Sequence, residues 1–127
     1  MPGIRRADRL TIADAQGHIP FPIVVPAGLP AGTRFLYAHV IGEQPTPRVA
    51  LTYEARVASR YYRISISESN VAVGPPLAHF EVRTRGGTTK AWTLPVRRWK
   101  HGAVVMDLFA PGLPAGMSNQ IVRANMI

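Results

Sequence analysis

The sequence predicts an all-β fold, an antiparallel β-sandwich or jelly roll of about eight or nine short strands with an extended N-terminal arm. Apolar and polar residues alternate with a period of two from Arg48 to Trp99, which is typical of strands with one buried and one solvated face. Short apolar runs on either side are separated by turns rich in proline and glycine. No amphipathic helix of ordinary length is visible in the sequence.

The central block is expected to hold strands at 49–57, 62–67 and 78–84, where β-branched and aromatic residues suit a pleated surface. Residues 70–76 form a connection, because their glycine and two prolines cannot continue a ladder. The clearest turn signal is the Gly-Gly pair within 85–89.

This turn predicts a hairpin with an odd-numbered loop and a glycine at positive φ. Such a loop would pair Val82 with Trp92 and Phe80 with Leu94, so that apolar residues share one face of the hairpin.

Before the central block, a first strand is expected at 10–12, followed by a turn at 14–17. Apolar residues then alternate through 19–25, but Pro20 and Pro22 remove backbone donors from one edge of this run. The run is therefore either a protected edge strand or an extended segment lying along a neighbour.

Three further strands are expected, at 33–41, 103–109 and, through Ile121 and Val122, within 119–127. The run 33–41 is apolar on both faces, so we place it centrally in a sheet. The pentapeptide Gly-Leu-Pro-Ala-Gly occurs twice, at 28–32 and 112–116. We interpret it as a good turn between strands that is used twice.

Length and composition indicate a single domain, residues 10–127, preceded by a basic arm, residues 1–9. The chain has no cysteine, which excludes disulfides and thiolate metal sites. No apolar run reaches the roughly 20 residues that span a bilayer, and the first residues lack the apolar core of a signal peptide. We expect a soluble protein made in a cytoplasm, with no membrane partner.

Fifteen basic and seven acidic residues give a net charge of +8. Such a surface favours a polyanion or an acidic protein as partner. The arginine excess also has a simpler interpretation, because a GC-rich genome produces chains rich in arginine, alanine, glycine and proline. That interpretation explains the scarcity of acids less well.

The residue types that carry chemistry are scattered. The serines lack the glycine context of a nucleophile elbow. The four histidines include no pair at metal-binding spacing, and the seven acids are dispersed along the chain. No glycine-rich phosphate loop is present. We expect no enzymatic activity, no metal site and no cofactor.

Two groups of residues are candidates for binding. Those from the arm, the proline-bearing run and an exposed tyrosine would contact neighbouring subunits; they are Ile4, Arg5, Arg6, Arg9, Pro20, Pro22 and Tyr61. Basic residues on solvated strand faces or beside Trp99 would contact a polyanion; they are Arg63, Arg83, Arg85, Arg97, Arg98 and Lys100. The simpler interpretation of the second group is a solvated surface with Trp99 in the core.

In its length, strand density, proline pairs (Pro20/Pro22 and Pro75/Pro76) and arm, the chain resembles the small β-sandwich or jelly-roll cement (decoration) proteins of tailed-bacteriophage heads. The resemblance concerns architecture and no motif, so no residue roles carry over. It implies a non-enzymatic virion protein, made in the host cytoplasm, that forms a dimer or trimer and clamps neighbouring subunits of a capsid shell. Outside a virion, we expect a cytoplasmic location.

Two other classes stay open. A nucleic-acid-binding coat protein or module would use Arg63, Arg83 and Arg85 on a sheet face. The RNA-phage coat proteins of similar length end in a pair of helices, which the tail 110–127 is not expected to supply. A carbohydrate-binding β-sandwich would need exposed aromatic residues, and only Tyr61 and Trp99 qualify.

Overall fold

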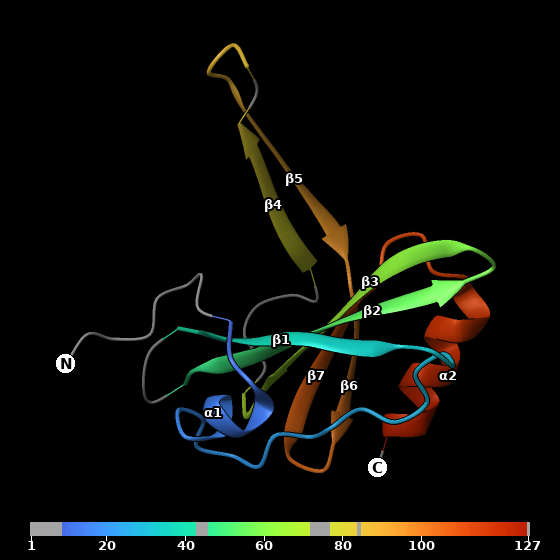
Figure 1. Ribbon diagram of the computed structural model, residues 1–127. Coiled ribbons are helices and arrows are strands. Elements are labelled where there is room, and N and C mark those ends of the chain that lie inside the picture. Colours follow the sequence, from blue (N-terminus) through green and yellow to red (C-terminus); the bar gives the residue numbers. More distant parts are fainter. Residues whose placement is uncertain (1–8, 43–45, 72–76, 84, 127) are drawn as a thin grey trace.

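The computed structural model describes residues 9–42, 46–71, 77–83 and 85–126, with the backbone alone for 77–83 and 90–95 (Figure 1). Seven strands and two helices lie within these residues. They are α1 (Ile12–Gln16), β1 (Arg34–Ile41), β2 (Arg48–Val57), β3 (Arg60–Ser69), β4 (Leu77–Arg83), β5 (Thr89–Pro95), β6 (Arg97–His101), β7 (Val104–Phe109) and α2 (Ala115–Asn125).

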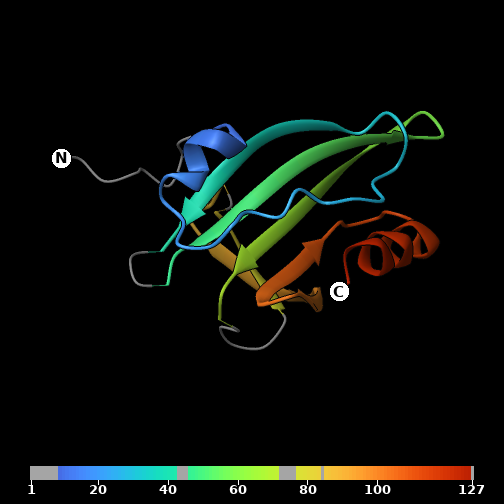
Figure 2. The same ribbon diagram turned by 90° about the horizontal axis from the view of Figure 1, so that it is seen from below.

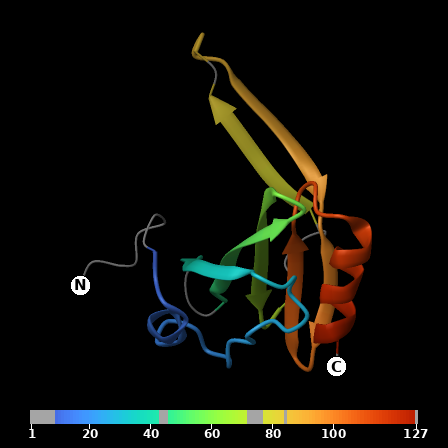
Figure 3. The same cartoon turned by 45° about the vertical axis from the view of Figure 1, so that its right-hand side comes forward.

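Five strands form the main sheet, in the order β1-β2-β3-β7-β6, and every neighbouring pair is antiparallel. Strands β4 and β5 pair only with each other, as a separate two-stranded sheet. This hairpin leaves the chain between β3 and β6 and projects away from the main sheet (Figures 1 and 3). The mostly β, antiparallel character agrees with the prediction from sequence.

A sandwich or jelly roll is not confirmed. In the described part of the chain, the layer packed on the main sheet consists of α1, residues 18–33 and α2 (Figure 2). We call residues 18–33 the covering segment. The strand count is also lower than predicted, because three segments expected to be strands are helical or extended.

The sheet face under these elements, called the covered face, holds the core. Leu51 of β2 lies opposite Ile66 of β3, which lies opposite Leu108 of β7. All three side chains are buried, as the period of two predicts. Ile19 and Phe21 of the covering segment and Ile121 of α2 complete the same cluster.

The expected strand at 10–12 is wrong, because the chain enters α1 there. The Thr11 hydroxyl accepts a hydrogen bond from the Asp14 backbone N–H at 3.1 Å, which is the N-cap interaction that starts a helix. Only Leu10 keeps a strand-like contact, a single antiparallel bridge to Ala38 of β1.

The run 19–25 is an extended segment lying along a neighbour, which was one of the two interpretations offered for it. Some of its backbone groups form hydrogen bonds with a side chain, where a strand would bond to the backbone of a neighbouring strand. The Gln16 amide donates to the Phe21 carbonyl and accepts from the Ile23 N–H, both at 2.8 Å. An amide side chain can thus replace one step of a ladder.

The tail is a helix, so the expected strand within 119–127 is wrong. Met117, Ser118, Ile121, Val122 and Asn125 are the buried or half-buried positions of α2. Their spacing follows the helical period. Because the buried position 125 holds the polar residue Asn125, the apolar stripe of α2 is interrupted. The hydrophobic pattern of the sequence therefore does not indicate this helix.

The predicted central place of the strand at 33–41 is also wrong, because β1 is an edge of the main sheet. For the hairpin, Gly87 has a positive φ of 78° and the ladder closes at Arg83 opposite Thr89, which leaves an odd-numbered loop. Both features were predicted. The register differs by two residues, because Phe80 lies opposite Trp92 instead of Leu94.

Candidate interaction surface

The second face of the main sheet, called the open face, lies on the side away from α1 and the covering segment, and the hairpin β4–β5 projects from this side (Figures 1 and 2). Residues directly opposite one another on paired strands share a face. The register therefore gives two rows across the open face, which are Tyr37, Thr52, Ser65 and Phe109, and then His39, Ala50, Ser67, Asp107 and Arg98.

The open face has short side chains at its centre and long ones at its margins. Ala50 and Thr52 of β2 and Ser65 and Ser67 of β3 form the centre. The strands on either side contribute aromatic rings and arginines. Thr52 is buried, and the half-buried hydroxyl groups of Ser65 and Ser67 make the middle of the face polar, able to donate or accept hydrogen bonds.

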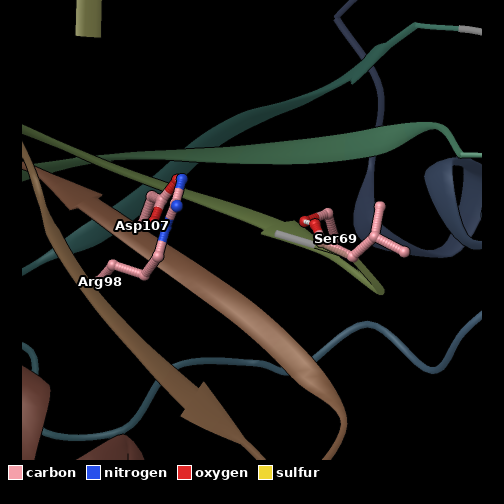
Figure 4. A network of polar contacts seen from close by, with 4 residues as sticks. Ser69, Arg98 and Asp107 are labelled. Carbon is pink, nitrogen blue, oxygen red and sulfur yellow. Dashed lines mark hydrogen bonds and ion pairs between the residues drawn. The ribbon is translucent and has the colours of Figure 1, made fainter. Parts of the chain in front are cut away.

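An arginine–carboxylate pair marks the β6–β7 margin (Figure 4). Arg98 Nε donates to Asp107 Oδ1 at 2.7 Å and Arg98 Nη2 donates to Asp107 Oδ2 at 3.0 Å. The two side chains are only 21% and 17% exposed. This two-point hydrogen bond with the carboxylate raises the pKa of Arg98 above its usual range.

A second pair lies on β1 and β2, where Arg34 Nη2 donates to Glu54 Oε1 at 2.9 Å. This pair is one wall of an open pocket of about 440 Å³ that Gly32, Arg56 and Tyr61 also line. Tyr61 is 64% exposed, and the Arg56 guanidinium carbon lies 5.7 Å from its ring centre.

Tyr37 is the centre of a cluster on β1. The Arg9 guanidinium carbon lies 4.8 Å above its ring centre, and Arg63 Nη1 donates to its hydroxyl at 3.3 Å. The His39 ring meets it edge-on at 4.7 Å. Arginine stacked on an aromatic ring is a favourable cation–π contact.

The residues expected at a subunit interface are spread over the molecule. Pro20 and Pro22 are exposed in the covering segment, far in sequence from the exposed Tyr61 at the β2–β3 turn, and Arg9 is exposed beside Tyr37. Ile4, Arg5 and Arg6 lie outside the described residues.

The residues expected at a polyanion site come together in part. Arg63, Arg98 and Lys100 lie on the open face by their register. Arg97 has the opposite parity and donates to Asn119 of α2. Arg85 is exposed in the loop of the hairpin, and Arg83 is the residue of β4 opposite Thr89.

Several open-face residues were not anticipated from sequence. Arg48 and Arg56 share the parity of Glu54 on β2. The alternation of that strand therefore carries the signal that puts them on the solvated face, although they were not among the candidate binding residues. Tyr37 was not anticipated because β1 is apolar at both parities, and nothing in its sequence tells which parity faces out.

The covered face holds a buried carboxyl group that the alternation of β3 also predicts, since Glu68 follows Ile64 and Ile66 at the same parity. Glu68 is fully buried, and burial raises its pKa to about 7 against the lowering effect of the hydrogen bond from Val24. Burial, and then the charge of Glu68, raise the pKa of Tyr53 to about 12.

Within the described ranges, no three histidine, aspartate or glutamate side chains gather as a metal site. None of the helices described is long and apolar enough to span a membrane. We compared the chain with models of protein families, with curated proteins and with solved structures, and none of them matches.

Proposed function

We propose that the protein is a non-enzymatic structural subunit that associates with copies of itself, as a dimer or trimer, within a larger protein assembly. The observation that carries this proposal is the projecting hairpin β4–β5, whose strands pair with no strand of the main sheet. A two-stranded hairpin alone is at best marginally stable in water. A neighbouring subunit would supply the missing support.

The residue types along the hairpin favour this role. Its register puts positions 78, 80 and 82 of β4 on the same side of the ribbon as positions 90, 92 and 94 of β5. The sequence has Lys90 at the end of this side next to the loop and apolar residues at the other five positions, which are Ala78, Phe80, Val82, Trp92 and Leu94. A projecting ribbon with five apolar residues at one parity is suited to packing on another protein.

The margins of the main sheet offer further contacts. β6 pairs with β7 alone, and the outer edge of β1 meets only the single bridge from Leu10 in the described part of the chain. Unpaired edges accept an added strand from a partner.

The setting that we propose is a virion, in which the protein acts as a head cement (decoration) protein or a minor capsid component and clamps neighbouring subunits of the shell. The projecting hairpin β4–β5, the sheet edges at β1 and β6 and the scattered chemical residues support a component that holds other proteins together and catalyses no reaction.

Light scattering behind a sizing column tests self-association. We expect a discrete mass of two or three times 13.9 kDa. The double variant Phe80→Ser/Trp92→Ser is expected to shift this mass to that of the monomer. The control variant His79→Ser/Thr93→Ser changes positions of the opposite parity and is expected to keep the oligomer.

Circular dichroism of each variant verifies that the main sheet is folded. A monomeric wild-type protein would refute self-association. Particles in the megadalton range would mean that the protein builds a shell by itself and would refute the clamp role.

A further inference from the structure

The open face carries more basic side chains than carboxylates among the described residues. Register and contacts place seven basic side chains on it, which are Arg9, Arg34, Arg48, Arg56, Arg63, Arg98 and Lys100. The carboxylates that the described residues place there are Glu54 and Asp107, and each is engaged by an arginine. The other basic side chains face no carboxylate within the described ranges, and such a surface attracts a polyanion.

Aromatic rings are interleaved with these charges. Tyr61 stands beside Arg56 at one end of β2 and β3, and Tyr37 stands between Arg9 and Arg63 nearer the middle of β1. Tyr61 is 64% exposed, so one face of its ring is accessible to a planar partner. Basic side chains that alternate with accessible rings are the elements that single-stranded nucleic acids require, because phosphates pair with arginine and bases stack on rings.

We propose that the open face binds single-stranded nucleic acid, with a base stacked on Tyr61 and phosphates held by Arg48, Arg56, Arg63 and Lys100. The short, half-buried side chains of Ser65 and Ser67 add hydroxyl groups for base edges or sugars.

The shape of the face selects a single strand over a duplex. The major groove of a duplex admits a helix or a two-stranded ribbon, and the bases of a duplex are stacked on one another and unavailable to tyrosine. A five-stranded sheet face fits neither requirement. An acidic protein would pair with the arginines but would leave the exposed ring of Tyr61 without a planar group to stack on.

This inference goes beyond the proposed structural role. A subunit whose sheet face holds nucleic acid would lie on the inner side of a shell as a minor capsid component, because an outer cement protein meets no genome. The hairpin and the sheet edges would then contact proteins, while the open face contacts the nucleic acid.

Fluorescence anisotropy with labelled 20-nucleotide oligo(dT) and oligo(U) tests the proposal on the full chain. We expect binding to weaken with salt, with a slope of log K against log salt between roughly −2 and −3, at about 0.7 per phosphate contact. Tyr61→Ala is expected to weaken binding roughly 5- to 150-fold. Tyr61→Phe keeps the ring and is expected to retain the wild-type affinity.

Two double variants that each remove two positive charges distinguish binding at the open face from nonspecific attraction to the net charge of the protein. Arg56→Gln/Arg63→Gln removes two open-face charges and is expected to reduce the salt slope by about 1.4. Arg60→Gln/Arg123→Gln removes two exposed charges that lie off the open face. The second variant is expected to keep the slope nearly unchanged.

Three results would overturn the proposal. They are the absence of binding at low salt, equal weakening by both arginine variants, and binding of an equivalent duplex or of poly-glutamate as tight as that of the single strand. The proposed function fails on a different measurement, because a light-scattering monomer would refute self-association whether or not the oligonucleotides bind.

Discussion

Glu68 of β3 and Val24 of the covering segment are joined across 44 residues by a single hydrogen bond. The Val24 N–H donates to Glu68 Oε1 at 2.7 Å, while Glu68 Oε2 is buried with no hydrogen-bond partner. This contact fastens extended chain to the covered face. A charged carboxylate in this position lacks half of the hydrogen bonds that it could accept, so the neutral acid is favoured.

The stability of the protein is therefore expected to fall as the pH rises through the window from about 4.5 to about 7. The folded state keeps the proton of Glu68 in this window, while the unfolded state has released it, so unfolding releases protons and becomes easier at higher pH. The full effect is on the order of 3 kcal/mol, at about 1.4 kcal/mol per pKa unit. Urea unfolding followed by tryptophan fluorescence between pH 4 and 8 measures it.

Glu68→Gln is expected to remove this pH dependence, because the neutral amide keeps an oxygen acceptor for Val24 and never ionises. The variant should be more stable than the wild-type protein at pH 8 and similar to it at pH 4. Glu54→Gln, on the open face, serves as the control and should leave the slope in place. An unchanged slope in Glu68→Gln would contradict the role assigned to this carboxyl.

Gly28 and Gly32 offer a test of packing between the covering segment and α2. Both have positive φ, at 73° and 80°, but a Cβ at Gly28 would lie 2.6 Å from the Ala124 Cβ, whereas one at Gly32 meets nothing within 4 Å. Gly32→Ala should cost about 1 kcal/mol of unfolding free energy from backbone strain alone. Gly28→Ala should cost roughly 2 to 4 kcal/mol, because the clash adds to that strain. Equal costs would show that α2 moves aside freely.

Asn125 holds the covering segment at a second point. Its Oδ1 accepts from the Ala27 N–H and its Nδ2 donates to the Ala27 carbonyl, both at 2.8 Å. Asn125→Ala leaves both backbone groups without this partner and should cost about 2 to 4 kcal/mol. Hydrogen exchange at the Ala27 amide should accelerate strongly in this variant. Protection equal to that of the wild-type protein would refute the assigned contact.

The two arginine–carboxylate pairs of the open face should differ in strength because they differ in exposure. Arg98 and Asp107 are 21% and 17% exposed, whereas Arg34 is 70% exposed beside Glu54 at 22%. Double-mutant cycles should give a coupling of about 1 to 2 kcal/mol for the first pair and below about 0.5 kcal/mol for the second. Added salt should weaken the second coupling more. The reverse order would mean that desolvation cancels the gain at Arg98.

Sequence reasoning succeeded where the alternation was long and one-sided. The runs 49–57 and 62–67 are strands β2 and β3, with the expected inward parity. It failed where a single polar side chain decides the local structure. Thr11 caps α1 instead of continuing a strand, and Gln16 satisfies the backbone of the covering segment.

The repeated pentapeptide shows why local sequence is insufficient. In each copy the N–H three residues after the proline bonds to the proline carbonyl, from Thr33 to Pro30 at 3.1 Å and from Met117 to Pro114 at 3.0 Å. The first turn stops at Gly32, which has a positive φ, while the second continues as α2. The residues that follow, and what they pack on, decide the outcome.

The sequence alone predicts several of the basic residues of the candidate site, but it does not predict which strands bring them together. Arg63, Arg98 and Lys100 were selected from their strand parity or their basic cluster, and they do share the open face. Their neighbours Arg48 and Tyr37 come from strands whose order in the sheet is a long-range property. Sequence period determines the face of a residue within its strand, but it does not determine which strands are adjacent.

The contact between Ala27 and Asn125 has a consequence for biosynthesis. The two residues are 98 positions apart, so a ribosome has to polymerise all the intervening residues before the covering segment can be fastened at this point. The contact between Val24 and Glu68 spans only 44 residues and can form once β3 has been made. The covering segment is therefore fastened in two stages, first near Val24 and last near Ala27, when α2 is complete.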